Sequence, residues 1–143
     1  MRGHSLPMDF RFLWPTQGYG KSTGKPTHVN VVKDGQILFD YMLKHPAVAN
    51  TKIIVYGASM GSQAAVHLTL KNQGKISALV IDGGLSSMTD IALASAPQAQ
   101  HDVIKAMLKM PYEAKEDIKA IAGVMLLFIH SREDNRYPLA RPK

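Results

Sequence analysis

A short apolar run leads directly into a glycine-flanked serine, and this junction constrains the fold more than any other feature of the sequence. Residues 53–56 read Ile-Ile-Val-Tyr, residues 57–61 read Gly-Ala-Ser-Met-Gly, and a stretch with helical spacing continues to Asn72. A run of apolar, partly β-branched residues bounded by a turn is typical of a strand buried on both faces of a sheet. A strand followed at once by a tight turn and a helix is the first half of a βαβ unit.

The same alternation continues along the rest of the chain. Apolar runs predict strands in three segments, at residues 52–56, 76–81 and 124–129. Helical spacing is found in four segments, at residues 29–44, at 60–72, at 89–109 with a break at Pro97, and at 113–121. The alternation predicts an α/β domain, with a mostly parallel sheet and helices on both faces. The length of 143 residues fits one domain, residues 1–143.

Composition argues against several classes of function. The sequence has no cysteine, which excludes disulfides, thiolate metal sites and a cysteine nucleophile; no metal or cofactor is expected. The net charge is +6, but the lysines are scattered singly, whereas nucleic-acid binders cluster basic residues and interleave aromatic ones. No nucleic-acid partner is therefore expected. No apolar run approaches the roughly 20 residues that cross a bilayer, and the N-terminal residues lack the apolar core of a signal peptide. These observations favour a cytoplasmic protein without a membrane span.

Ser59 lies at the centre of the Gly-x-Ser-x-Gly pattern, where a serine can serve as a nucleophile. The strand before it and the helix after it supply the context that this pattern requires. We expect both Gly57 and Gly61 to be needed, because the turn is tight and a side chain at either position would collide with the neighbouring strand or helix. The N-terminus of the following helix directs backbone N–H groups at the serine, and the N–H of Met60 is the candidate donor to an oxyanion.

Three landmarks in this order resemble the α/β-hydrolase superfamily, in its serine-aminopeptidase-like and Bem-type branch. Residues 56–62, Tyr-Gly-Ala-Ser-Met-Gly-Ser, resemble the nucleophile elbow of that family. Residues 18–26, Gly-Tyr-Gly-Lys-Ser-Thr-Gly-Lys-Pro, resemble its "RGYGxSxGxP" loop, although Pro-Thr-Gln stands before them where the family has Asp-x-Arg. Residues 127–134, Leu-Phe-Ile-His-Ser-Arg-Glu-Asp, resemble its late strand and "HGxxDxxVP" loop.

The resemblance covers residues 17–138 and implies a reaction. By that match Ser59 is the nucleophile and Asp134 the acid of a Ser-Asp-His triad, while His130 has a structural role and Ser131 replaces the usual glycine. The implied reaction is attack of the serine on an ester, thioester or amide carbonyl, without a cofactor. The implied partner is a small-molecule or peptide acyl substrate.

The histidine base of that triad is not found where the family has it. In the family the base follows the acid, and no histidine follows Asp134 in this sequence. His67 lies roughly 12 Å along the helix axis from Ser59, too far to reach the serine. The other histidines considered are His28, His45, His101 and His130. We therefore expect a partial α/β-hydrolase fold, shortened relative to the family, which self-associates through exposed sheet edges.

Other interpretations of single segments remain open at this stage. The helical excursion of residues 86–122 falls where the family often has a cap. Asp82, at the end of a predicted strand, is either an alternative acid or a turn residue. A nucleotide-binding loop at Gly20-Lys21-Ser22 is disfavoured, because Pro15 stands where that motif requires its first glycine. The sequence is thus interpreted as a serine hydrolase, with a catalytically inactive hydrolase-like fragment or interaction module as the alternative.

Overall fold

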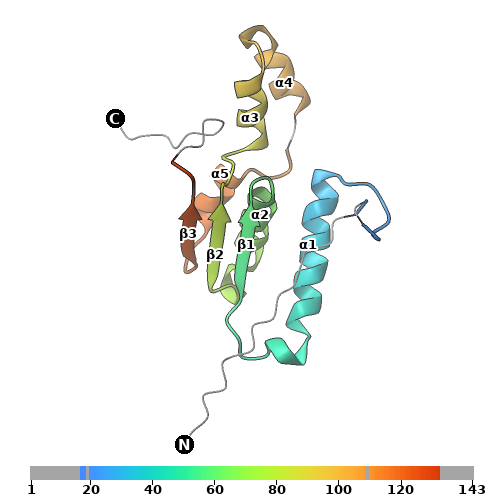
Figure 1. The fold of residues 1–143 in the computed structure, drawn as a ribbon, viewed down its shortest axis with the longest axis vertical. Helices are drawn as coiled ribbons and strands as arrows, with labels where there is room; N and C mark the ends of the chain where they lie inside the picture. The colour runs from blue at the N-terminus through green and yellow to red at the C-terminus, as the bar shows by residue number, and fades with distance from the viewer. Residues whose placement is uncertain (1–16, 19, 109, 133–143) are drawn as a thin grey trace, which may run out of the picture.

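The computed structural model describes residues 17–18, 20–108 and 110–132 (Figure 1). The helices and strands, in chain order, are α1 (His28–Leu43), β1 (Ile54–Ala58), α2 (Gly61–Asn72), β2 (Ala78–Asp82), α3 (Met88–Ser95), α4 (His101–Met107), α5 (Ala114–Asp117) and β3 (Met125–Ile129). Short 3-10 turns follow α1, α2 and α5 and precede α4. Each predicted strand and helix is therefore present, with boundaries that differ by a few residues.

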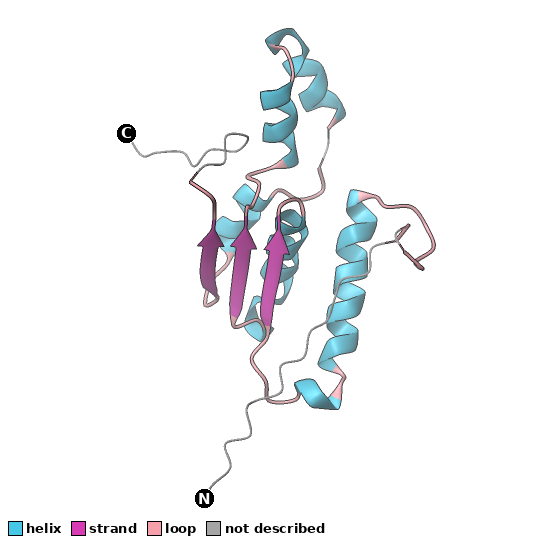
Figure 2. Cartoon of the chain, viewed as in Figure 1, coloured by secondary structure: helices cyan, strands magenta, loops and turns pink. Residues whose placement is uncertain are grey.

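The three strands form one parallel sheet in the order β1-β2-β3 (Figure 2). Ile54 pairs with Ala78, and Ala78 pairs with Met125, so the strands start at the same level and end at the same edge. Successive parallel strands require crossover connections, which α2 supplies between β1 and β2 and the longer helical segment supplies between β2 and β3. The predicted α/β class with a parallel sheet is confirmed.

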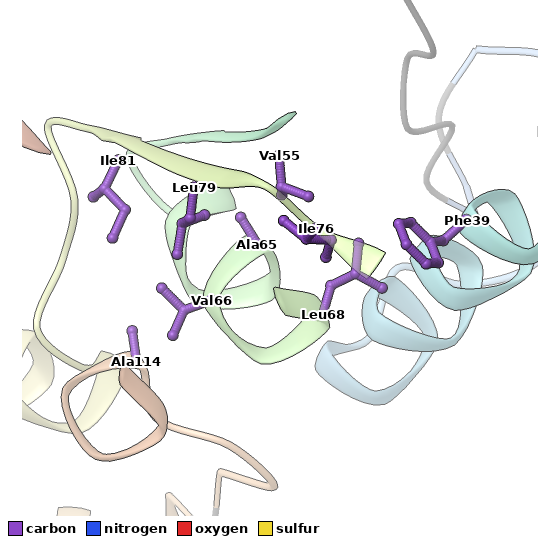
Figure 3. Close-up of a cluster of buried hydrophobic side chains, with 9 residues drawn as sticks. All are labelled: Phe39, Val55, Ala65, Val66, Leu68, Ile76, Leu79, Ile81 and Ala114. Carbon is purple, nitrogen blue, oxygen red and sulfur yellow. The ribbon is translucent and has the colours of Figure 1, made fainter. Parts of the chain in front are cut away.

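The hydrophobic core lies between the sheet and α2 (Figure 3). Val55 from β1 and Leu79 from β2 point at the helix, where Val66 is fully buried. Phe39 from α1 closes one end of this core and Ala114 from α5 the other. The complete cluster is Phe39, Val55, Ala65, Val66, Leu68, Ile76, Leu79, Ile81 and Ala114.

Helices were predicted on both faces of the sheet, but among the described residues the face away from α2 is open. In the described part of the chain no helix covers the strand residues that point away from α2. On β1 these are Ile54 and Tyr56, both exposed, and on β3 all five residues are exposed. The reason is that α2 packs on one side of the sheet, and α1 and α5 pack in turn on α2 (Figure 3). The apolar runs therefore predicted the strands correctly. They did not predict that, among the described residues, helices cover one face of the sheet and not the other.

The long connection between β2 and β3 contains a helical hairpin. Ser87 caps α3, its hydroxyl oxygen accepting a hydrogen bond from the Asp90 N–H at 2.9 Å, and the helix ends just before Pro97. The break predicted at Pro97 is therefore confirmed, and α4 begins at His101. The α3–α4 hairpin projects beyond the C-terminal ends of the strands (Figure 1).

Candidate active site

The C-terminal ends of the three strands are tied together at one edge of the sheet. The Ser59 N–H donates to the Asp82 carbonyl at 2.9 Å, and the Gly83 N–H donates to the Ile129 carbonyl at 2.8 Å. His130 follows β3 directly. Ser59, the turn after β2 and His130 therefore share the edge at which open parallel sheets bind their ligands. The acid predicted by resemblance, Asp134, lies outside the described residues.

Ser59 adopts an unusual backbone conformation. Its φ of 47° is positive, which among the described non-glycine residues is shared only with Asn50. The Ser59 carbonyl accepts two hydrogen bonds from Ser62, from the N–H at 3.0 Å and from the hydroxyl at 2.6 Å. A non-glycine residue in this region costs of order 1–3 kcal/mol and persists only where its surroundings impose it. The sharp strand–turn–helix geometry expected of a nucleophile elbow is thus present, with the serine exposed at its apex.

Replacing Ser59 by glycine removes this strain. We expect Ser59→Gly to raise the free energy of unfolding by about 1 kcal/mol, because glycine adopts positive φ without steric cost. Asn50→Gly, at φ 64°, is the matched control, and its gain is expected to be smaller since asparagine tolerates this region better than serine does. Urea unfolding of the three proteins measures the difference. A Ser59→Gly protein less stable than the parent would contradict a strained serine.

The two glycines of the elbow have different roles. A Cβ built on Gly57 would lie 2.5 Å from the Ala65 Cβ, 2.8 Å from the Ser62 Cα and 2.9 Å from the Gly61 carbonyl oxygen. Gly57 is therefore required, because the strand end touches the backbone of α2. A Cβ on Gly61 meets nothing within 4 Å among the described residues. The prediction that both positions exclude a side chain is correct for Gly57 and wrong for Gly61, which lies on the outer side of the first helical turn.

Met60 directly precedes α2, and its side chain is exposed. The first N–H groups of a helix have no intrahelical acceptor and carry the positive end of the helix dipole. The Gln63 N–H donates to the Met60 carbonyl at 3.2 Å, which fixes this first turn beside the serine. The Met60 N–H thus lies at the start of α2, and its role as an oxyanion donor stays a prediction.

His67, eight positions after the serine, has a structural partner. Its Nδ1 lies 2.6 Å from the Asp117 Oδ2, and its ring packs on Tyr112 with ring centroids 5.1 Å apart. Burial raises the pKa of the Tyr112 hydroxyl, which donates to the His28 carbonyl at 3.2 Å. The His67–Asp117 pair joins α2 to α5, in agreement with the prediction that His67 is not the base for Ser59.

The other described histidines are positioned as follows. His101 Nε2 lies 3.1 Å from the Ala96 carbonyl oxygen, at the end of α3, and His45 Nδ1 accepts a backbone N–H two residues along the chain. His130 lies at the C-terminal edge of the sheet, after β3, and His28 is the first residue of α1. Among the residues that the structure describes, no histidine side chain is hydrogen-bonded to the Ser59 hydroxyl.

Asp82 is part of a side-chain pair. Its carboxylate accepts a hydrogen bond from the Tyr56 hydroxyl across the open face of the sheet, and this bond raises the pKa of the tyrosine. The register places Asp82 next to Ala58, immediately before the serine. The residue considered as an alternative acid is therefore close to the elbow and already bound to a neutral donor.

Two residues near the elbow were not identified from the sequence. Ser62 and Gln63 are almost completely buried, although polar side chains are usually expected on the exposed side of a helix. Their side chains are hydrogen-bonded to segments far away in the sequence, around Leu85 and Ala114. The available signal was a polar pair directly before the apolar run of residues 64–66.

Comparison with known proteins agrees with this geometry. Residues 11–137 match the family described as serine aminopeptidase, S33. The sequence is 33% identical over 127 residues to protein bem46 of Schizosaccharomyces pombe, which covers 89% of this chain and 42% of that protein. It is 32% identical over 81 residues to the α/β-hydrolase domain-containing protein WAV2 of Arabidopsis thaliana, covering 57% of this chain and 26% of that protein.

A crystal structure of an α/β-hydrolase from Vibrio vulnificus has the same fold, with a TM-score of 0.64 at 24% identity over 79% of this chain and 43% of that one. The chain therefore belongs to the serine aminopeptidase S33 family of the α/β-hydrolase superfamily, in its Bem-type branch. It spans less than half the length of these relatives. None of the described helices is long and apolar enough to cross a membrane.

Proposed function

We propose that this chain is a serine hydrolase in which Ser59 attacks the carbonyl of an ester, thioester or amide. The observation that carries the proposal is the positive φ of Ser59, at an exposed turn between β1 and α2. A serine hydroxyl in that position can approach a substrate carbonyl from the edge of the sheet. The Met60 N–H is assigned to the developing oxyanion. The substrate is a small molecule or peptide that carries an acyl group.

The acid and the base of the triad are assigned separately. Asp134 is the proposed acid, on the resemblance of residues 127–134 to the loop that carries it in the family. The base is expected to be histidine, which accepts the serine proton and returns it to the leaving group. No described histidine is hydrogen-bonded to Ser59, and a base added in solution is expected to accelerate the reaction of the serine.

A fluorophosphonate probe with added imidazole tests this assignment. Imidazole supplies a proton acceptor, so labelling of Ser59 is expected to accelerate roughly 100-fold, in the range of general-base catalysis. Tryptic mass spectrometry identifies the modified residue, and Ser59→Ala should abolish labelling. Ser86→Ala, at a nearby exposed serine, is the matched control and should label like the parent. Absence of labelling even with imidazole would favour the inactive alternative, as would equal labelling of the Ser59→Ala protein.

A second candidate function is an interaction module that self-associates through the sheet. The observation that favours it is the open apolar face: Tyr56 is 58% exposed, Leu127 53% and Met125 73%. Among the described strands, β1 and β3 each pair with β2 alone, so each has a free edge. Unpaired strand edges and exposed apolar surface favour association between chains.

Sedimentation velocity across a range of concentrations measures this association. We expect a concentration-dependent dimer or larger species for the parent, and a shift to monomer for Leu127→Lys, which puts a charge on the open face. Ile37→Lys, at an exposed position of α1 away from the sheet, is the control and should sediment like the parent. A monomeric parent at all concentrations would contradict the self-association.

A further inference from the structure

The side chain of Gln63 is hydrogen-bonded to the chain on both sides of the α3–α4 hairpin. Its Nε2 donates to the carbonyl of Leu85, before α3, and its Oε1 accepts from the Ala114 N–H at 2.9 Å, after α4. Gln63 is 3% exposed, and both partners are buried. One side-chain amide therefore forms hydrogen bonds with the backbone of residues 85 and 114, which are 29 positions apart (114 − 85) in the chain.

Neighbouring bonds close the two ends into one neck, here defined as residues 85–90 and 113–117. The Lys115 N–H donates to the Ser86 carbonyl at 2.9 Å, and this bond joins the two segments of the neck directly. The Lys115 Nζ lies 2.8 Å from the Asp90 carboxylate, and this hydrogen bond lowers the pKa of Asp90 and raises that of Lys115. The Thr89 hydroxyl donates to Glu113 at 2.6 Å.

The neck is also connected to the serine. The Leu85 N–H donates to the Ser62 hydroxyl at 3.2 Å, and that hydroxyl donates to the Ser59 carbonyl at 2.6 Å. Ser62 and Gln63 are adjacent on the first turn of α2, so a single helical turn contacts both the elbow and the neck. By contrast, α3 and α4 contain no buried residue, which leaves the hairpin with little support beyond its base.

We propose that Gln63 is a positioning residue: it fixes the α3–α4 hairpin, through the neck, at a set place relative to Ser59. The hairpin thereby limits the size of the acyl group that reaches the serine. This last step rests on the proposed function, whereas the anchoring of the hairpin does not. Removal of the amide leaves two buried backbone groups without partners, and such groups are costly enough to open the neck.

Hydrogen–deuterium exchange tests the anchoring without any need for activity. In Gln63→Met, which keeps the length and burial of the side chain, amides of residues 85–117 are expected to exchange roughly tenfold faster, while those of β1 and β2 stay unchanged. Gln73→Met is the matched control, since Gln73 Oε1 also accepts a backbone N–H, from Ala122 at 2.7 Å, at an exposed site after α2. Uniformly faster exchange throughout the chain, or no change in the neck, would overturn the proposal.

Two further measurements complete the design. Gln63→Glu retains an acceptor for Ala114 but turns a carboxylate oxygen toward the Leu85 carbonyl, so exchange in the neck is expected to be at least as fast as in Gln63→Met at neutral pH. At low pH the protonated carboxyl can donate to Leu85, so exchange relative to the parent at the same pH should slow again, and this variant replaces Gln63→Met if the latter fails to fold. Imidazole-assisted labelling by short-chain and long-chain fluorophosphonates should lose its preference for the short chain in Gln63→Met. General destabilisation would slow both probes equally and would contradict the positioning role. If neither probe labels the parent, the proposed function fails while the exchange result still stands.

Discussion

Gly57→Ala is expected to lower the free energy of unfolding by about 3 kcal/mol, the upper end of the usual cost of overpacking a core. The added methyl group would meet the Ala65 side chain and the backbone of Ser62 and Gly61, all closer than 3.0 Å. Backbone cannot give way as the end of a long side chain can, so β1 and α2 must separate. Urea unfolding followed by circular dichroism measures the change.

The control is the other glycine of the same motif. Gly61→Ala should change the free energy of unfolding by no more than about 0.5 kcal/mol, as is usual for surface positions, because its Cβ meets no described atom within 4 Å. Equal destabilisation by the two substitutions would show that the turn, and not the contact of Gly57 with α2, sets the requirement for glycine.

Leu79→Ala is expected to cost about 2–5 kcal/mol, the range found for large-to-small substitutions in cores. Leu79 lies on the central strand, is fully buried and faces α2, so the substitution removes packing from the middle of the core. A loss of this size is comparable to the whole stability of a small domain, and the variant is expected to be largely unfolded near 37 °C.

Leu127→Ala provides the comparison, since it is the same change on the neighbouring strand but on the open face of the sheet. Leu127 is 53% exposed, so the expected cost is below about 1 kcal/mol at protein concentrations too low for association. A loss as large as that of Leu79→Ala would mean that the face carrying Leu127 is covered, in conflict with a sheet packed on one side.

Much of the fold follows from local sequence patterns. The apolar runs at β1, β2 and β3 and the break before α4 were all identifiable, because period and turn residues are local properties. The burial of each face was not identifiable, since a continuous apolar run looks the same whether helices cover one side of a strand or both. Tyr56 and Leu127 illustrate this limit, for both belong to apolar runs and both are exposed.

For the site, too, the local features could be predicted from the sequence and the long-range contacts could not. Ser59 and Gly57 carry a motif, and the motif specifies the backbone turn that the structure shows. Gln63 carries no motif, because its role depends on where residues 85 and 114 come together in space. Contacts between segments so far apart in sequence depend on tertiary packing. The spacing of apolar residues within one helix does not predict them.

We propose that the Ser59 turn presents a nucleophile beside an oxyanion donor. A crystal structure of the protein after reaction with a fluorophosphonate in the presence of imidazole tests this arrangement. We expect phosphorus bonded to the Ser59 Oγ, and a phosphonyl oxygen that accepts a hydrogen bond from the Met60 N–H at about 2.7–3.1 Å. An adduct on another residue, or a phosphonyl oxygen turned away from Met60 into solvent, would contradict it.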